Sequence, residues 1–137
     1  MTRAEVQLFP IVAAALVDGD GRVLVQQRPP ATPMAGLWEF PGGKIEDAET
    51  PESALVRELR EELGIDTEES CLAPATFASA PLDGQHLLLL LYVCRKWRGT
   101  PQPLHASALK WVRPPELFRL EMPPADIPLI GILDALI

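Results

Sequence analysis

The sequence has little positive charge, and this shortage limits what the protein can bind. Lysine and arginine together number 12, against 19 aspartate and glutamate residues, so the net charge is −7. This sign disfavours a partner held through a broad phosphate-neutralising surface, and we expect no nucleic-acid partner. If the substrate is anionic, positive charge has to be supplied locally.

Cysteines and long apolar segments are also scarce. The two cysteines, Cys71 and Cys94, show no spacing typical of a zinc site or a disulfide framework. Their apolar surroundings predict buried free thiols, which fits a reducing compartment. The longest apolar run, Leu87 to Cys94, has eight residues, far below the roughly 18 of a membrane span. The first ten residues hold no apolar signal-peptide core. We therefore expect a cytoplasmic protein without a membrane partner.

The chain has the size and composition of one globular domain. Its 137 residues are 47% hydrophobic and 23% charged, which is typical of a folded protein with a sizeable core. We find no internal repeat, low-complexity tract or interdomain linker. The sequence therefore predicts a single domain over residues 1–137.

Apolar periodicity and turn residues predict an α/β sandwich with a mixed β-sheet between helices. The expected strands are 6–17, 22–27, 73–80, 86–97 and 108–112, with a short extended piece at 38–40. Asp18-Gly19-Asp20-Gly21 predicts a tight turn that pairs the first two strands as a hairpin. A final helix is expected over 125–137, after two prolines.

Residues typical of both helix termini predict one helix. Thr50 is a good N-cap residue, Pro51 suits the first helical position, and Gly64 is typical of a C-terminal stop. Between them, apolar residues recur at helical spacing at Leu55, Leu59 and Leu63. We therefore expect a helix from Pro51 to Gly64 that buries one face.

Three glutamates, Glu58, Glu61 and Glu62, gather on a second face of this helix. Like charges three and four residues apart repel by roughly a few tenths of a kcal/mol per pair. A divalent cation would relieve that repulsion, and oxygen ligands select hard ions such as Mg²⁺ or Mn²⁺. The alternative is a solvated face whose glutamates pair with Arg57 and Arg60.

The pattern around the glutamates favours the metal site. From Gly43 to Ile65 the chain matches every fixed position of G-x5-E-x7-R-E-U-x-E-E-x-G-U, where U is aliphatic. Nine specified positions coincide by chance with odds on the order of 10⁻⁹ per window. This motif is the Nudix box, and the chain resembles the Nudix hydrolases. The flanking segments LWEFPG at 37–42 and PPAD at 123–126 are similar to the MutT branch, whose members hydrolyse nucleoside triphosphates and sanitise the nucleotide pool.

The resemblance implies the Nudix fold, an α/β/α sandwich, and a Mg²⁺-dependent reaction in which Mn²⁺ can substitute. It assigns the metal to three side chains and one carbonyl oxygen, those of Glu58, Glu61, Glu62 and Gly43. Arg57 joins the glutamates in the catalytic group and pairs with Glu49 to fix the preceding loop against the helix. Water attacks the β-phosphorus, which releases a nucleoside monophosphate and pyrophosphate. Glu58 or a residue of a later loop would take the water's proton.

Four residues outside the box match substrate-binding positions of the family. Arg28 matches an arginine that contacts phosphate, and its alternative is a plain surface charge. Glu39 and Phe40 fall in the substrate segment, although Phe40 could equally belong to the core. Asp126 stands where the best-known MutT proteins have an asparagine that reads the purine edge. An ionised carboxylate only accepts hydrogen bonds, so the aspartate leaves the base undecided. The alternative for Asp126 is a helix N-cap.

A second departure from the family lies at His105, where relatives place an additional glutamate. Imidazole is a poor ligand for Mg²⁺ but a candidate general base near neutral pH. A solvated loop histidine is the alternative.

The sequence thus predicts a monomeric Mg²⁺-dependent pyrophosphohydrolase that acts on oxidised nucleoside triphosphates such as 8-oxo-dGTP. One alternative keeps the chemistry and changes the base to that of CTP or 5-methyl-dCTP. The other is a Nudix-fold module that binds a nucleotide without hydrolysing it.

Overall fold

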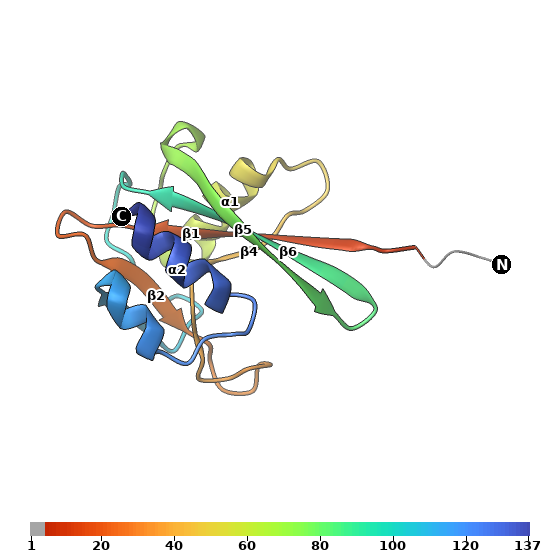
Figure 1. Cartoon of the computed structure of the whole chain (residues 1–137). Helices are drawn as coiled ribbons and strands as arrows, with labels where there is room; N and C mark the ends of the chain where they lie inside the picture. The colour runs from red at the N-terminus through yellow and green to blue at the C-terminus, as the bar shows by residue number, and fades with distance from the viewer. Residues whose placement is uncertain (1–4) are drawn as a thin grey trace.

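A computed structural model describes residues 5–137, and the first four residues of the predicted domain lie outside this range. Two β-sheets and two α-helices make up the fold (Figure 1). The larger sheet has the order β4-β1-β6-β5 and is mixed, because β1 and β6 run parallel while the other pairs are antiparallel. The smaller, antiparallel sheet has the order β3-β2-β7. The strands are β1 (Leu8–Leu16), β2 (Val23–Gln27), β3 (Trp38–Glu39), β4 (Gly42–Lys44), β5 (Leu72–Leu82), β6 (Gln85–Cys94) and β7 (Ala108–Val112).

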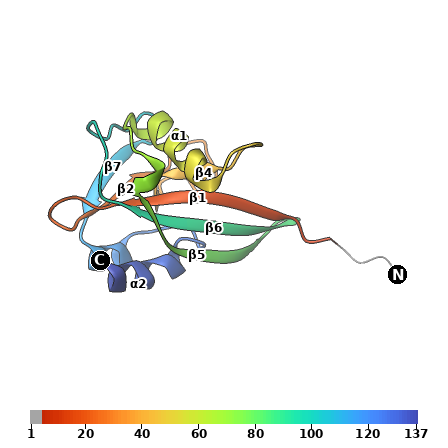
Figure 2. The same cartoon turned by 90° about the horizontal axis from the view of Figure 1, so that it is seen from above.

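Strand β1 is buried on both faces, which places it at the centre of the molecule. Val12, Ala14 and Leu16 point into one core, together with the apolar side chains of α1 (Pro51–Leu63). The alternate residues Ala13 and Ala15 point into the other core, beneath α2 (Ile127–Leu136). The two helices lie on opposite sides of the larger sheet (Figure 2). This arrangement confirms the predicted α/β sandwich with a mixed sheet between helices.

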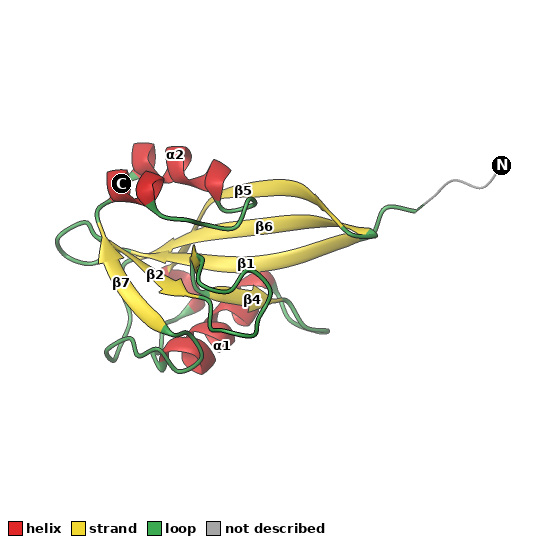
Figure 3. Cartoon of the chain, turned by 90° about the horizontal axis from the view of Figure 1, so that it is seen from below, coloured by secondary structure: helices red, strands yellow, loops and turns green. Residues whose placement is uncertain are grey.

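The predicted hairpin between the first two strands is wrong beyond its turn. The turn forms, with Gly21 N–H donating to the Asp18 carbonyl oxygen over 3.1 Å. The strands then meet only at the Val17–Val23 bridge and diverge into different sheets (Figure 3). The reason is that β4 and β6 already occupy the two edges of β1.

Helix α1 confirms the predicted capping. The Thr50 hydroxyl accepts from the Ser53 N–H over 3.1 Å, Pro51 occupies the first position, and Gly64 ends the helix with a left-handed φ of 70°. Its buried residues are Ala54, Leu55, Leu59 and Leu63. The helix is therefore fixed against the sheet along one face, and its glutamates are held in register with the neighbouring strands.

Several other boundaries differ from the prediction. Residues 42–44 form β4, where only a break was expected, and two 3-10 helices, η1 (Glu69–Cys71) and η2 (Pro114–Arg119), were not predicted. Cys94 is a buried free thiol as expected, whereas Cys71 is free but partly exposed in η1. Among residues 5–137, no helix is long and apolar enough to cross a membrane.

Candidate active site

The glutamate face of α1 lies against β4 and the end of β2. Glu62 is the most enclosed of the three glutamates. Its Oε2 accepts from Gln26 Nε2 over 2.8 Å and from the Gly42 N–H over 3.3 Å. Burial is the main influence on this carboxyl and raises its pKa to about 7; the Gln26 amide opposes that shift and the charge of Glu58 adds to it. No arginine pairs with Glu62 in the described chain.

Glu58 packs directly against a glycine of β4. A Cβ atom on Gly43 would lie 2.5–2.7 Å from the three atoms of the Glu58 carboxylate, so the absence of a side chain at Gly43 makes room for it. The Glu58 side chain is 14% exposed. Its pKa is raised, chiefly by burial, while its contact with Arg57 acts in the opposite direction.

Arg57 joins the helix to the loop before it. Its Nε and Nη2 donate to the two carboxylate oxygens of Glu49 over 2.7 and 2.9 Å, and Nη2 also donates to the Lys44 carbonyl oxygen over 3.1 Å. The Nη1 atom reaches Glu58 at 3.0 Å and the half-exposed Glu61 at 3.1 Å. The Glu49 contact is the main cause of the raised pKa of Arg57, and Arg57 in turn lowers the pKa of Glu49. This is the predicted pairing of the box arginine with the upstream glutamate.

The alternative of a solvated glutamate face describes the structure only in part. Arg57 does pair with Glu58 and Glu61. Arg60, however, turns away and binds Asp66 at 2.8 Å. Glu62 is held by neutral donors instead, so its charge is not balanced by an arginine.

The donor set at this site suits a hard divalent cation. Glu58 and Glu62 are two poorly solvated carboxylates, and burial is the main cause that raises both pKa values. The charge of Glu58 raises the pKa of Glu62 further, and the charge of Glu61 does the same to Glu58. A cation would relieve the repulsion among these charges, and the carboxylates offer it oxygen ligands, whereas the Gly43 carbonyl stays a predicted ligand. Within residues 5–137, no three acidic, histidine or cysteine side chains already converge as a preformed cage. Mg²⁺ does not require one, since it is usually held by one or two carboxylates plus substrate phosphates.

A cavity of about 510 Å³ adjoins these glutamates. Gly42 and Gly43 form part of its wall, and the same two glycines contact Glu62 and Glu58, which do not themselves line the cavity. All four predicted substrate residues, Arg28, Glu39, Phe40 and Asp126, line the cavity. Segments far apart in the sequence therefore meet around one space, next to the two glycines that contact the carboxylates.

Asp126 is buried in this cavity, with 7% of its surface exposed. It occupies the N-cap position of α2, but its side chain makes no capping hydrogen bond. Burial raises its pKa to about 7 and the charge of Glu39 adds to the shift, while the Phe40 N–H and Arg28 act against it. The carboxyl therefore does not cap α2, and with a pKa of about 7 it can carry a proton near neutral pH.

Arg28 and Phe40 are both fixed by their surroundings. Arg28 Nη1 donates to Glu39 over 2.8 Å and its Nε donates to the Pro33 carbonyl oxygen over 2.7 Å, so it is not a free surface charge. Phe40 is 4% exposed and belongs to the α2-side core as well as to the cavity wall, so both of its predicted roles describe its position. In the loop that connects Arg28 to Phe40, Ala31 and Met34 have positive φ values of 67° and 57°. Strain of this kind clusters at ligand-binding loops.

His105 lies outside the cavity, on an exposed loop. Its neighbours attach this loop beside the site, because Leu104 N–H donates to the Glu62 carbonyl oxygen and Ser107 N–H to that of Gln27. Gln26 and Lys44 also lie near the site, although the sequence did not predict a position there for either residue. Lys44 Nζ lies 5.4 Å from the centre of the Phe9 ring, which lines the cavity. Two features of the sequence could have indicated them: Gln26 stands at a core-facing position of a predicted strand, and Lys44 directly follows Gly43, the first glycine of the box.

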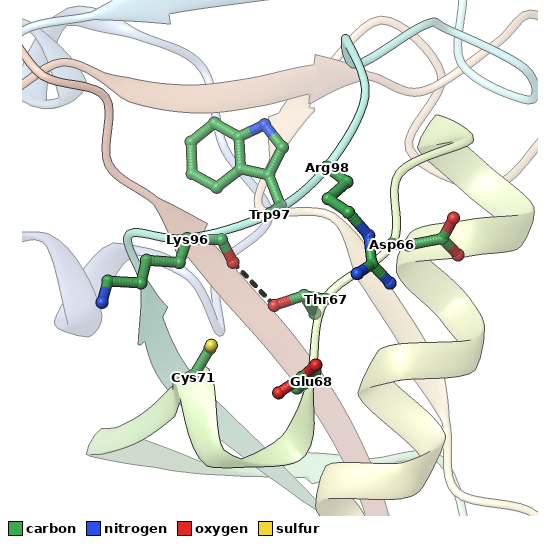
Figure 4. Close-up of a pocket in the computed structure, with 7 residues that line it drawn as sticks. All are labelled: Asp66, Thr67, Glu68, Cys71, Lys96, Trp97 and Arg98. Atoms are coloured by element: carbon green, nitrogen blue, oxygen red, sulfur yellow. Dashed lines mark hydrogen bonds between the residues drawn. The ribbon is translucent and has the colours of Figure 1, made fainter.

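A second, smaller cavity of about 220 Å³ lies beyond the C-terminal end of α1, between residues 66–71 and 96–98. Its lining mixes charges of both signs around Thr67, whose hydroxyl donates to the Lys96 carbonyl oxygen over 2.7 Å (Figure 4). None of the predicted site residues lines it. The candidate active site is therefore the larger cavity together with the glutamate face.

Known proteins resemble the chain over most of its length. Residues 8–131 match the NUDIX domain family. The chain is 41% identical over 125 residues to the CTP pyrophosphohydrolase of Escherichia coli K12, covering 91% of each chain. It is 32% identical over 126 residues to the 8-oxo-dGTP diphosphatase of the same organism, covering 92% of this chain and 96% of that one.

A solved structure shows the same fold. It comes from a study of MutT from Aliivibrio salmonicida and Vibrio cholerae, has 29% sequence identity and a TM-score of 0.80, and covers 96% of this chain and 100% of the other. The match to the NUDIX domain covers nearly the whole length of the chain. The chain therefore belongs to the Nudix hydrolase family, among its MutT-like pyrophosphohydrolases.

Proposed function

We propose that the protein hydrolyses a nucleoside triphosphate to the nucleoside monophosphate and pyrophosphate, with Mg²⁺ as its metal. The observation that carries this proposal is the shared wall of Gly42 and Gly43. These two glycines line the 510 Å³ cavity and also contact the carboxylates of Glu62 and Glu58. A nucleotide with its base in the cavity can thus place its phosphates at the carboxylates.

Each residue has a distinct task in this proposal. Glu58 and Glu62 would hold the metal, with Glu61 beside them, and the bound metal would neutralise phosphate charge and lower the pKa of the attacking water. Arg28 offers its guanidinium to a phosphate from the cavity wall. Arg57 holds the glutamates and the loop in register. Glu58 or His105 would take the proton from the water.

The state of Asp126 decides which bases fit the cavity. A protonated carboxyl presents one donor and one acceptor side by side. This pair matches O6 and N7–H of 8-oxoguanine, whereas ordinary guanine presents two acceptors at the same edge. We therefore propose oxidised purine nucleotides such as 8-oxo-dGTP as substrates, with unmodified dGTP used less well.

Cytosine nucleotides are the second candidate. The same donor and acceptor of Asp126 match N3 and N4–H₂ of cytosine. The 41% identity to a CTP pyrophosphohydrolase over 91% of the chain favours this base. We propose a free nucleotide rather than a nucleic acid in either case, because the net charge of −7 leaves no broad basic surface.

A substrate panel with Mg²⁺ tests the proposal. We would compare kcat/KM for 8-oxo-dGTP, dGTP, CTP, 5-methyl-dCTP, dATP and ADP-ribose, since polar mismatches in a pocket discriminate strongly. Glu62→Gln should retain the fold and lose turnover by roughly 10²-fold or more. A metal-dependent thermal shift with nucleotide, but no turnover over hours, would instead indicate a binding module. Full activity of Glu62→Gln would refute the site.

A further inference from the structure

Gln26 is a polar residue at a position where the fold calls for an apolar one. Side chains of β2 alternate between the two cores: Val23 and Val25 point toward α2, and Leu24 points toward α1. Gln26 is two residues after Leu24, so it also faces α1, and it is 5% exposed. An amide in this place has to find partners within the protein, or from a ligand.

Only one end of the Gln26 amide has a partner. Its Nε2 donates to Glu62 Oε2 over 2.8 Å. Its Oε1 is buried and accepts no hydrogen bond, and it is the one side-chain nitrogen or oxygen within residues 5–137 in that state. Leaving a buried acceptor unpaired costs about 1–3 kcal/mol. The orphaned oxygen lies on the same amide that holds a predicted metal ligand, which indicates that its donor arrives with the metal.

We propose that Gln26 is a positioning residue of the metal site: its N–H groups orient the Glu62 carboxylate, and its Oε1 accepts a hydrogen bond from a water molecule that hydrates the divalent cation. This inference rests on the proposed metal-dependent function. Mg²⁺ keeps several waters when it binds to a protein, and these waters need acceptors. Groups that orient metal ligands in this way typically contribute 10–100-fold to metal affinity.

The test is the affinity of the nucleotide-free protein for Mn²⁺, measured by isothermal titration calorimetry. Gln26→Met keeps the length of the side chain and removes both ends of the amide. We expect its Kd for Mn²⁺ to rise by about 10–100-fold. Its melting temperature in EDTA should change little, because the unpaired Oε1 is removed while Glu62 Oε2 loses its 2.8 Å donor and keeps the Gly42 N–H. Gln26→Leu, which repeats the apolar residue at Leu24, serves if the methionine variant folds poorly.

The matched control is Gln27→Met. Gln27 is the next residue of β2, points to the opposite face, and donates only to the Gly36 carbonyl oxygen in the loop. Its Mn²⁺ affinity should equal that of the wild type. Wild-type affinity in both Gln26 variants would overturn the inference, as would a lower melting temperature in EDTA with unchanged affinity. If the wild type itself binds no Mn²⁺ and hydrolyses nothing, the proposed function fails instead.

Discussion

Two adjacent glycines, Gly42 and Gly43, have different roles, one in stability and the other in activity. A Cβ atom on Gly42 would lie 2.0 Å from the backbone oxygen of Val12, whereas the three atoms nearest to one on Gly43 all belong to the end of the Glu58 side chain. Backbone in a central strand cannot move aside, but a side-chain carboxylate can. The glycine at 42 is thus required by the sheet and the glycine at 43 by the site.

Gly43→Ala should therefore reduce activity more than stability. The new methyl group would displace the Glu58 carboxylate, so we expect kcat/KM to fall by at least roughly 10-fold, while the melting temperature changes by only a few degrees. Steady-state kinetics and thermal denaturation measure the two effects. Gly131→Ala is the control, because nothing lies within 4 Å of its Cβ position in α2 and alanine is favoured there by about 1 kcal/mol. A Gly43→Ala enzyme with full activity would contradict this account of Glu58.

Asp126 should make the stability of the protein depend on pH. Its pKa is about 7 in the folded chain, mainly through burial and then through Glu39, and near 3.9 in an unfolded one. The folded state therefore retains a proton that the unfolded state has lost, and this contribution to stability declines as pH rises from about 4 to about 7.

Asp126→Asn should remove this decline, because an amide does not titrate. The difference in melting temperature, variant minus wild type, should grow between pH 4 and pH 7. At pH values above 7 it should amount to several degrees. Thermal denaturation in EDTA at a series of pH values measures the difference. A difference that does not vary with pH would show that Asp126 ionises normally in the folded protein.

At the scale of elements, the loop before α1 depends on one arginine. Arg57 binds both oxygens of Glu49 and the Lys44 carbonyl oxygen, so a single guanidinium joins the helix, the loop and the end of β4. Lysine keeps the charge but cannot make these contacts together.

Arg57→Lys should consequently weaken both the loop and the site. We expect a loss of about 1–2 kcal/mol in the free energy of unfolding and a decrease in kcat of roughly 10-fold or more. Urea denaturation and steady-state kinetics test these values. Arg60→Lys is a matched control on the same helix, since Arg60 makes only the exposed contact with Asp66. Equal losses in the two variants would mean that the Glu49 contact carries no special role.

Elements with local signals were predictable from the sequence, and those set by distant contacts were not. Thr50, Pro51 and Gly64 determine the ends of α1 within a few residues of themselves, so the helix and its glutamate face follow from the sequence. The hairpin prediction failed because the choice of partner for each edge of β1 involves strands far along the chain. Gln26 was missed for the same reason: only the packing of β2 on α1 brings it to Glu62.

At the scale of the whole molecule, the acidic balance and the expected anionic substrate are compatible. The net charge of −7 disfavours a broad basic face, and part of the acidity is concentrated on one helix beside a cavity. Carboxylates gathered there can recruit the cation that the surface lacks, and Arg28 adds one guanidinium in the cavity wall. The predicted substrate residues converge because the β2–β3 pair holds residues 28 and 39 together, β4 brings residues 42 and 43, and the start of α2 brings residue 126 to the same cavity. The box was recognisable in the sequence, but the convergence of these residues on one cavity could not be predicted without the folded structure.

We propose above all that Glu58 and Glu62, with a divalent cation, direct water at the β-phosphorus of a nucleoside triphosphate. Hydrolysis of 8-oxo-dGTP and of CTP in ¹⁸O-labelled water with Mg²⁺, followed by mass spectrometry of the products, tests it most directly. We predict that for at least one of the two nucleotides the label enters pyrophosphate and not the monophosphate, and that turnover is lost in EDTA and in Glu62→Gln. Label in the monophosphate, release of inorganic phosphate as the first product, or turnover that persists in EDTA would contradict the account.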